Sequence, residues 1–241
     1  IDVRIHSAAG DLVQRVELRG RDQSIVIDHV AAAPDMVIFD AGNRLLKSLT
    51  FDQPVAWLAN ELARDPDLWD RQWAIEQLAW HGTDSDAVAA LAGAALHADY
   101  YLTRSEAVAA LGGVPAALAM PAVRGAMRDT SAAVRVAAVG ALEKFGGDSV
   151  AAIARAAFRD DPSYEVRAAA LLAAVHSDPA HAHELIGEGL HAASYRDAIA
   201  DATFQAIAQL NDTGYIAAVD SATGRLEYPA HVLAVLGARG N

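Results

Sequence analysis

The chain has 241 residues, of which 53% are hydrophobic, and it carries a formal net charge of −12. This composition predicts a folded chain with a sizeable core, and the acidic balance excludes nucleic-acid and anionic-membrane surfaces, because both need a basic stripe. The sequence has no cysteine, which excludes disulfides, thiolate metal sites and a cysteine nucleophile, and no apolar run reaches the ~18 residues of a membrane span.

The first part of the chain, residues 1–52, follows the two-residue period of half-buried strands. We expect about five short strands, in the segments 1–5, 16–19, 24–28, 36–39 and 44–51. This is a small β-sandwich-type domain with too few strands to cover its own edges, so a missing N-terminal part or the helices would complete it. Because Ile1 lies in the middle of a strand pattern, we expect the chain to be a piece of a longer protein.

The second part, residues 53–241, follows the 3.6-residue period of amphipathic helices from Pro54 onward. Helices are expected at 54–64, 69–81, 84–97, 102–112, 115–128, 131–145, 148–159, 163–176, 179–192, 194–210, 212–222 and 226–238. Twelve helices of this length make about six antiparallel pairs.

One phrase of this helical part occurs twice. The segment 129–142 is repeated in register at 161–174, 32 residues later, and weaker copies place arginines at the same position of the phrase. These arginines are Arg71, Arg104, Arg135 and Arg167. A period of this length is typical of stacked helical repeats.

Three of the four phrases have an aspartate six residues before the arginine. In a stack of repeats, the aspartate of one turn is expected to bind the arginine of the neighbouring repeat, forming a structural ladder. The ladder residues are Asp65, Arg71, Asp129, Arg135, Asp161 and Arg167. The pattern resembles the HEAT repeat over residues 54–210, so the predicted fold class is mostly α, a HEAT-like α/α superhelix preceded by the small β-domain.

The junction between the two parts resembles the C-terminal region of gluzincin zinc aminopeptidases of the alanyl-aminopeptidase class. The strand phrase around 34–52 and the helix phrase around 70–78 carry this resemblance. The matching residues are Phe39, Asp40, Leu46 and Lys47 in the first phrase, and Asp70, Arg71, Ala74 and Leu78 in the second. The resemblance implies a helical bowl that closes over a peptidase active site and shapes access to it.

The catalytic motifs of that family are absent from this sequence. Neither His-Glu-x-x-His nor Gly-x-Met-Glu-Asn occurs, so no catalytic and no metal-binding residue is assigned. The resemblance implies that the chain itself has no cofactor, that zinc is held only in a catalytic domain upstream, and that this domain is one partner. The enzyme class of the parent would be a peptide hydrolase.

Four tryptophans gather near the junction. Trp69, Trp73 and Trp80 share one helix face, and Trp57 is in the preceding helix. They are interpreted as packing between the β-domain and the first repeat, with a peptide-stacking or partner-anchoring patch as the functional alternative.

Two further groups have functional alternatives. His176, His181 and His183 with Glu184 have the residue types of a metal or pH-sensitive site, but their place around a helical turn favours capping or solvent exposure. A tyrosine in a turn between repeats, such as Tyr195, favours a cap on the apolar seam over a ligand contact.

Three functions remain open on the sequence. The first is the non-catalytic region of a zinc aminopeptidase-like protein, in the cytoplasm, with peptides in a concave face. The alternative is a HEAT-repeat scaffold that binds a protein partner in that face. The third, enzyme activity as in bilin lyases with similar short repeats, rests only on the generic repeat, and no cysteine is available.

Overall fold

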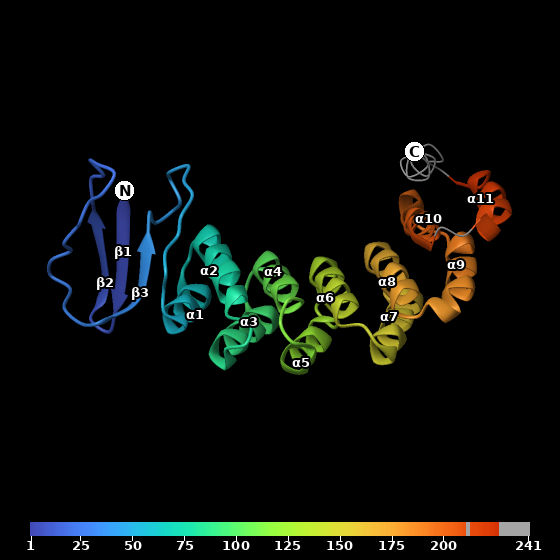
Figure 1. Cartoon of the computed structure of the whole chain (residues 1–241), viewed down its shortest axis with the longest axis horizontal. Helices are drawn as coiled ribbons and strands as arrows, with labels where there is room; N and C mark the ends of the chain where they lie inside the picture. The colour runs from blue at the N-terminus through green and yellow to red at the C-terminus, as the bar shows by residue number, and fades with distance from the viewer. Residues whose placement is uncertain (211–212, 227–241) are drawn as a thin grey trace. The chain divides into compact units, whose positions relative to one another are not determined.

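The computed structural model describes residues 1–210 and 213–226 (Figure 1). The chain forms two compact units, unit 1 over Ile1–Ala122 and unit 2 from Val123 onward. The division into a β-domain at 1–52 and a helical domain at 53–241 stays a prediction.

Unit 1 begins with a three-stranded antiparallel sheet. Its strands are β1 (Asp2–Ser7), β2 (Gly10–Arg15) and β3 (Pro34–Phe39), and β1 lies in the centre. On one face, Val3 and Ile5 pack with the partly buried side chains of the segment that follows β2. The other face carries the buried Met36 and Ile38, and β3 contacts the first helix, α1 (Val55–Arg64).

The prediction of about five strands is wrong for the described residues, which contain three. The second strand, β2, occupies residues 10–15 and not the predicted 16–19. The segment 24–28 forms no strand, because Ile25 and Ile27 pack on the sheet as a covering segment. The segment 44–51 forms no strand either. There, the Leu45 amide and the Lys47 ammonium both donate hydrogen bonds to Asp40, which holds the chain in a turn.

The helices of unit 1 form antiparallel pairs. They are α1 (Val55–Arg64), α2 (Leu68–Trp80), α3 (Ser85–His97), α4 (Tyr101–Leu111) and α5 (Ala116–Ala126), the last of which crosses the unit boundary. Asp67 and Asp84 cap α2 and α3 by accepting hydrogen bonds from first-turn amides. Helices α1 and α3 lie in one layer, and α2 and α4 lie in the other (Figure 1).

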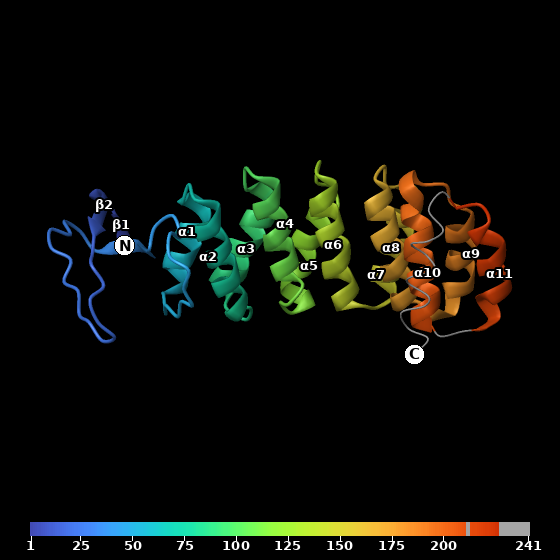
Figure 2. The same cartoon turned by 90° about the horizontal axis from the view of Figure 1, so that it is seen from above.

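Unit 2 continues the same pairing. Its helices are α6 (Ala132–Phe145), α7 (Asp148–Asp160), α8 (Tyr164–Ser177), α9 (Ala182–His191), α10 (Ala198–Leu210) and α11 (Ile216–Thr223). Short 3-10 turns precede α9, α10 and α11, at Pro179–His181, Tyr195–Asp197 and Thr213–Tyr215. Helix α8 contacts both α6 and α10, and Figure 2 shows α8 and α10 side by side.

One predicted helix begins later in the structure, and another lies almost entirely outside the described residues. The helix predicted at 194–210 begins at Ala198, because Arg196 and Asp197 have φ values of 53° and 57°, in the left-handed region that an α-helix does not adopt. Of the helix predicted at 226–238, residues 227–238 lie outside the described residues.

The repeated phrase forms the core of both units. Three residues after each phrase arginine stands a fully buried alanine, and seven after it stands a buried leucine or alanine. These residues are Ala74, Ala107, Ala138, Ala170, Leu78, Leu111, Leu142 and Ala174. The small side chains let helices of one layer approach closely, and this close packing explains the HEAT-like fold of the described helices. In residues 1–210 and 213–226, no helix has the length and hydropathy needed to cross a bilayer.

Candidate functional site

Three of the four phrase arginines tie their helix to the turn before it. Arg71 Nε donates to the carbonyl of Asp65 at 2.5 Å, and Arg135 Nη1 donates to the carbonyl of Asp129 at 2.9 Å. Arg104 Nη1 reaches the carbonyl of residue 98 at 2.9 Å in the same way. In these three repeats the acceptor is six residues before the arginine, whereas Arg167 donates to a carbonyl nine residues before it.

Two of these arginines also reach the turn of the following repeat. Arg71 binds Asp99 at 2.6 Å. Nε and Nη2 of Arg135 each donate a hydrogen bond of 2.8 Å to the Asp161 carboxylate. Burial acts to raise the pKa of Asp161, but the Arg135 guanidinium outweighs it and holds the pKa below its usual value. Arg135 and Asp161 are thus two predicted ladder residues that the structure brings together.

The other predicted ladder residues have different partners. Asp65 is fully buried and binds Arg4 of β1 at 2.7 Å. Asp129 accepts the amide of Ser131 at 2.7 Å, and Arg167 donates to the carbonyl of Phe158 at 2.8 Å. Asp65 therefore anchors the sheet to the first helical pair.

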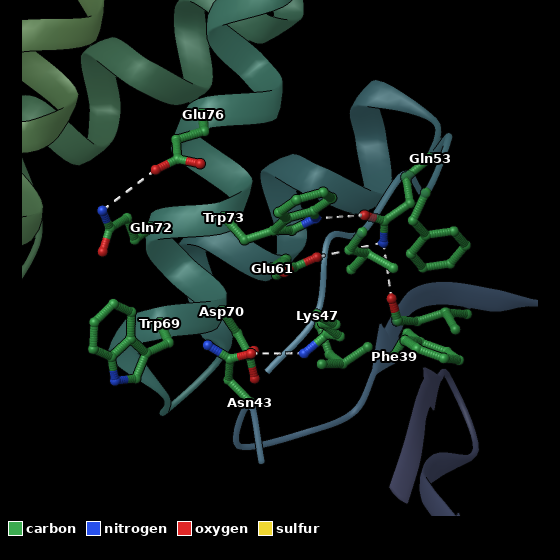
Figure 3. A pocket seen from close by; sticks show the side chains of 14 residues that line it. Phe39, Asn43, Lys47, Gln53, Glu61, Trp69, Asp70, Gln72, Trp73 and Glu76 are labelled. Carbon is green, nitrogen blue, oxygen red and sulfur yellow. Dashed lines mark hydrogen bonds between the residues drawn. The ribbon is translucent and has the colours of Figure 1, made fainter. Parts of the chain in front are cut away.

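A cavity of about 260 Å³ lies between this sheet and the first helical pair, within unit 1 (Figure 3). Its floor is formed by β3, one side by the segment 43–53, and the other side by α1 and α2. The polar side chains and tryptophans of the lining are Asn43, Lys47, Gln53, Glu61, Trp69, Asp70, Gln72, Trp73 and Glu76.

Gln53 connects the three walls of the cavity. Its amide nitrogen donates to the carbonyl of Val37 at 2.8 Å and lies 3.4 Å from Glu61 Oε2. Its carbonyl oxygen accepts the indole N–H of Trp73 at 3.3 Å, as Figure 3 shows. The positions of Glu61 and Trp73 are thereby fixed relative to β3.

Two buried carboxyl groups face the cavity, and their burial raises the pKa of each. Glu61 is 2% exposed, and burial, followed by the charge of Asp70, raises its pKa to about 8. Asp70 is 7% exposed, and burial, followed by the charges of Asp65 and Asp67, raises its pKa to about 6. Asp70 Oδ2 is buried and accepts no hydrogen bond from any described residue.

The one cationic lining residue is already paired. Lys47 Nζ donates to Asp40 Oδ2 and to Asn43 Oδ1, each at 2.6 Å. Burial acts to raise the pKa of Asp40, but Lys47 and the Leu45 amide outweigh it and hold the pKa below its usual value. The charge of Lys47 is therefore matched by Asp40, and the cavity retains an excess of carboxyl groups.

The tryptophans differ in their surroundings. Trp73 lines the cavity, Trp69 lines it while remaining 64% exposed, and Trp80 is 85% exposed. Trp57 is half-buried on α1. The structure thus places Trp73 at the junction with β3 and leaves Trp69 and Trp80 largely open to solvent.

The histidines of unit 2 have separate partners. His176 contacts Glu143 and Gln209, His181 contacts Asp178 at 2.8 Å, and the ring of His183 lies 4.6 Å from that of Tyr215. In the described residues, no three metal-ligating side chains converge on one point.

The sequence interpretation missed Glu61, Gln53 and the cavity. A signal was present, because Glu61 lies between Leu58 and Leu62 on the apolar face of a helix, where a carboxyl group is unusual.

The fold and the repeat geometry define a HEAT-like helical repeat protein with a small N-terminal sheet. Residues 94–175 match the HEAT repeats family. Among solved structures, a chain in the structure of the complex of CpcE and CpcF of phycocyanin lyase from Nostoc sp. PCC7120 is similar, with a TM-score of 0.50 and 22% identity. The similarity covers 82% of this chain and 81% of that chain, and it shows the fold. No curated protein matches the sequence.

These findings overturn the resemblance to zinc aminopeptidases. The family match is to HEAT repeats, and the similar solved chain comes from a phycocyanin lyase complex. The residues that carried the resemblance have local structural roles. Asp40 pairs with Lys47 and Arg71 with Asp99, while Ala74 and Leu78 are fully buried between helices. An upstream peptidase domain and its zinc have no support.

Proposed function

We propose that this chain is a HEAT-repeat interaction module that binds a protein partner through α2. The observation that carries the proposal is the exposure of Trp69 and Trp80, at 64% and 85%, on one helix. Tryptophan is enriched among the residues that dominate binding energy at protein interfaces, because it buries a large apolar area and keeps one polar group. Two such side chains on one rigid helix supply anchors that lose little conformational entropy on binding.

Two further observations support a protein partner. The net charge of −12 disfavours nucleic acid and anionic membranes, and stacked helical repeats expose extended surfaces suited to polypeptides. The similar solved chain comes from a complex of two proteins, CpcE and CpcF. A protein partner for the present chain agrees with that arrangement.

The test is selection of binding peptides from a displayed random library on the immobilised full chain. The dissociation constants of selected peptides are then measured for the wild type and for Trp69→Ala, Trp80→Ala and the control Tyr195→Ala. Tyr195 is an exposed aromatic residue of unit 2. Truncating an anchoring tryptophan typically removes about 2 kcal/mol or more.

We therefore expect each tryptophan variant to weaken binding at least about tenfold, and Tyr195→Ala to leave it unchanged. Circular dichroism of each variant verifies that it is folded. The proposal is refuted if no peptide is selected, or if the selected peptides bind both tryptophan variants as tightly as the wild type.

A further inference from the structure

The cavity beside α2 is lined by more carboxyl groups than cationic groups. Its carboxyl groups Glu61, Asp70 and Glu76 come from α1 and α2. The Asp70 carboxylate, on a residue 7% exposed, has an oxygen with no hydrogen-bond partner among the described residues. A buried, unpaired carboxylate oxygen is costly unless a donor from outside the chain reaches it.

The cations near these carboxyl groups are already engaged. Arg4 binds Asp65 at 2.7 Å, and Lys47 binds Asp40 at 2.6 Å. Neither is available as a partner for Asp70 without leaving another buried carboxylate unpaired. The Asp70 oxygen without a partner is therefore suited to a positively charged donor supplied by a ligand.

The size and the walls of the cavity narrow the choice of ligand. A volume of about 260 Å³ is below the roughly 300–1,000 Å³ of pockets for drug-sized ligands, so it suits one side chain of a larger partner. The indoles of Trp69 and Trp73 are four residues apart on α2 and so lie on the same helix face. A guanidinium stacks on aromatic faces and presents a planar set of donors to carboxylates, which an ammonium does not.

We propose that this cavity receives an arginine side chain of the partner polypeptide, whose guanidinium binds Asp70 and Glu61 and stacks on the tryptophans at the rim. The inference rests on the proposed interaction function, and it means that the module prefers partner segments that present an arginine. Gln53 and Trp73, which bond to each other at 3.3 Å, keep the Glu61 wall in place for the incoming side chain (Figure 3).

Binding of the arginine is expected to depend on pH. Burial keeps the pKa of Glu61 at about 8 and that of Asp70 at about 6, so Glu61 is mostly protonated at neutral pH and must lose its proton to pair with a cation. Affinity should then fall by up to about tenfold per pH unit below pH 8. The charged groups around the two carboxyls are Arg4 on β1, Lys47 after β3, Asp65 and Asp67 between α1 and α2, and Glu76 on α2.

The test uses three blocked amino acids with the full chain, namely the N-acetyl N-methylamides of arginine, citrulline and lysine. Each is titrated at pH 8 while the indole N–H signal of Trp73 is followed by nuclear magnetic resonance. Citrulline has the shape of arginine without its charge. We expect a saturable shift with arginine, affinity at least about tenfold lower with citrulline, and weaker binding with lysine.

The variants Asp70→Asn and Glu61→Gln should each reduce arginine affinity at least about tenfold, and Glu165→Gln on α8 is the matched control. Equal binding of citrulline and arginine, tighter binding of lysine, no saturable shift, or unchanged affinity of Asp70→Asn would overturn the inference. The citrulline comparison needs no variant, so it decides even where a variant fails to fold. If arginine does not bind while tryptophan-dependent peptides do, the inference fails and the interaction function stands.

Discussion

Replacing Glu61 with glutamine should stabilise unit 1 increasingly as the pH rises. Glu61 is buried, and its pKa is raised from 4.5 to about 8 by burial first and by the charge of Asp70 second. Between these values, the folded chain holds a proton that the unfolded chain has lost. The free energy of unfolding therefore falls as the pH rises through this interval. Glutamine keeps the shape of the protonated group and does not titrate.

The magnitude follows from the proton difference. One proton corresponds to about 1.4 kcal/mol per pH unit. Between pH 6.5 and 7.5 Glu61 remains mostly protonated in the folded chain, while Asp70, with a pKa of about 6, is mostly ionised in both states. The wild type should lose about 1 kcal/mol of unfolding free energy over this single unit through Glu61, and about 3 to 5 kcal/mol over the whole interval.

The assay is urea denaturation at several pH values, followed by tryptophan fluorescence. All four tryptophans lie between residues 57 and 80, so the signal reports unit 1 alone. The control Glu165→Gln should follow the wild type. If the wild type and Glu61→Gln lose stability in parallel between pH 6.5 and 7.5, Glu61 is already ionised at neutral pH, and the reasoning about its burial is refuted.

Two further substitutions test the packing of each unit. Arg4→Met should destabilise unit 1 by about 3 to 5 kcal/mol, because it leaves the carboxylate of Asp65 buried without its partner. The same fluorescence assay measures this change, and a decrease in unfolding free energy of less than about 1 kcal/mol would show that water replaces the arginine. Gly189→Ala should destabilise unit 2 by about 1 to 3 kcal/mol, because the added methyl group would lie 2.2 Å from the hydroxyl oxygen of the buried Thr203. Hydrogen exchange of the α9 amides measures this decrease in stability. When Gly189→Ala is made in the Thr203→Ala variant, which has room for the methyl group, most of the decrease should disappear. An equal decrease in the wild type and in Thr203→Ala would contradict the close approach.

The helical repeats could be predicted because their signal is local and repeated. Ala138 and Leu142 occupy the same positions after Arg135 as Ala107 and Leu111 occupy after Arg104, and each of these apolar side chains is buried. A helix buries one face, so its pattern is readable without knowledge of its neighbours. The contacts of Arg71, Arg104 and Arg135 to carbonyl groups six residues earlier are also local, so they could have been predicted from the repeat.

The sheet and the cavity depended on contacts distant in sequence. Ile25 and Ile27 alternate as a strand would, yet they cover the sheet instead of extending it, because β1 already pairs on both edges with β2 and β3. Glu61 and Gln53 meet only when α1 packs against β3. Local periodicity contains no information about such pairings, and the junction phrases were assigned to the wrong family for the same reason.

The similarity of the phrases at Arg135 and Arg167 also bears on how such a gene changes over generations. Two similar stretches, 32 residues apart and in the same reading frame, are sites for unequal crossing-over, which would remove or add one helical pair at a time. The new junction would keep the helical phase and the spacing from the arginine to the buried alanine three residues after it. Relatives of this chain are therefore expected to differ in length by whole helical pairs more often than by isolated residues within a helix.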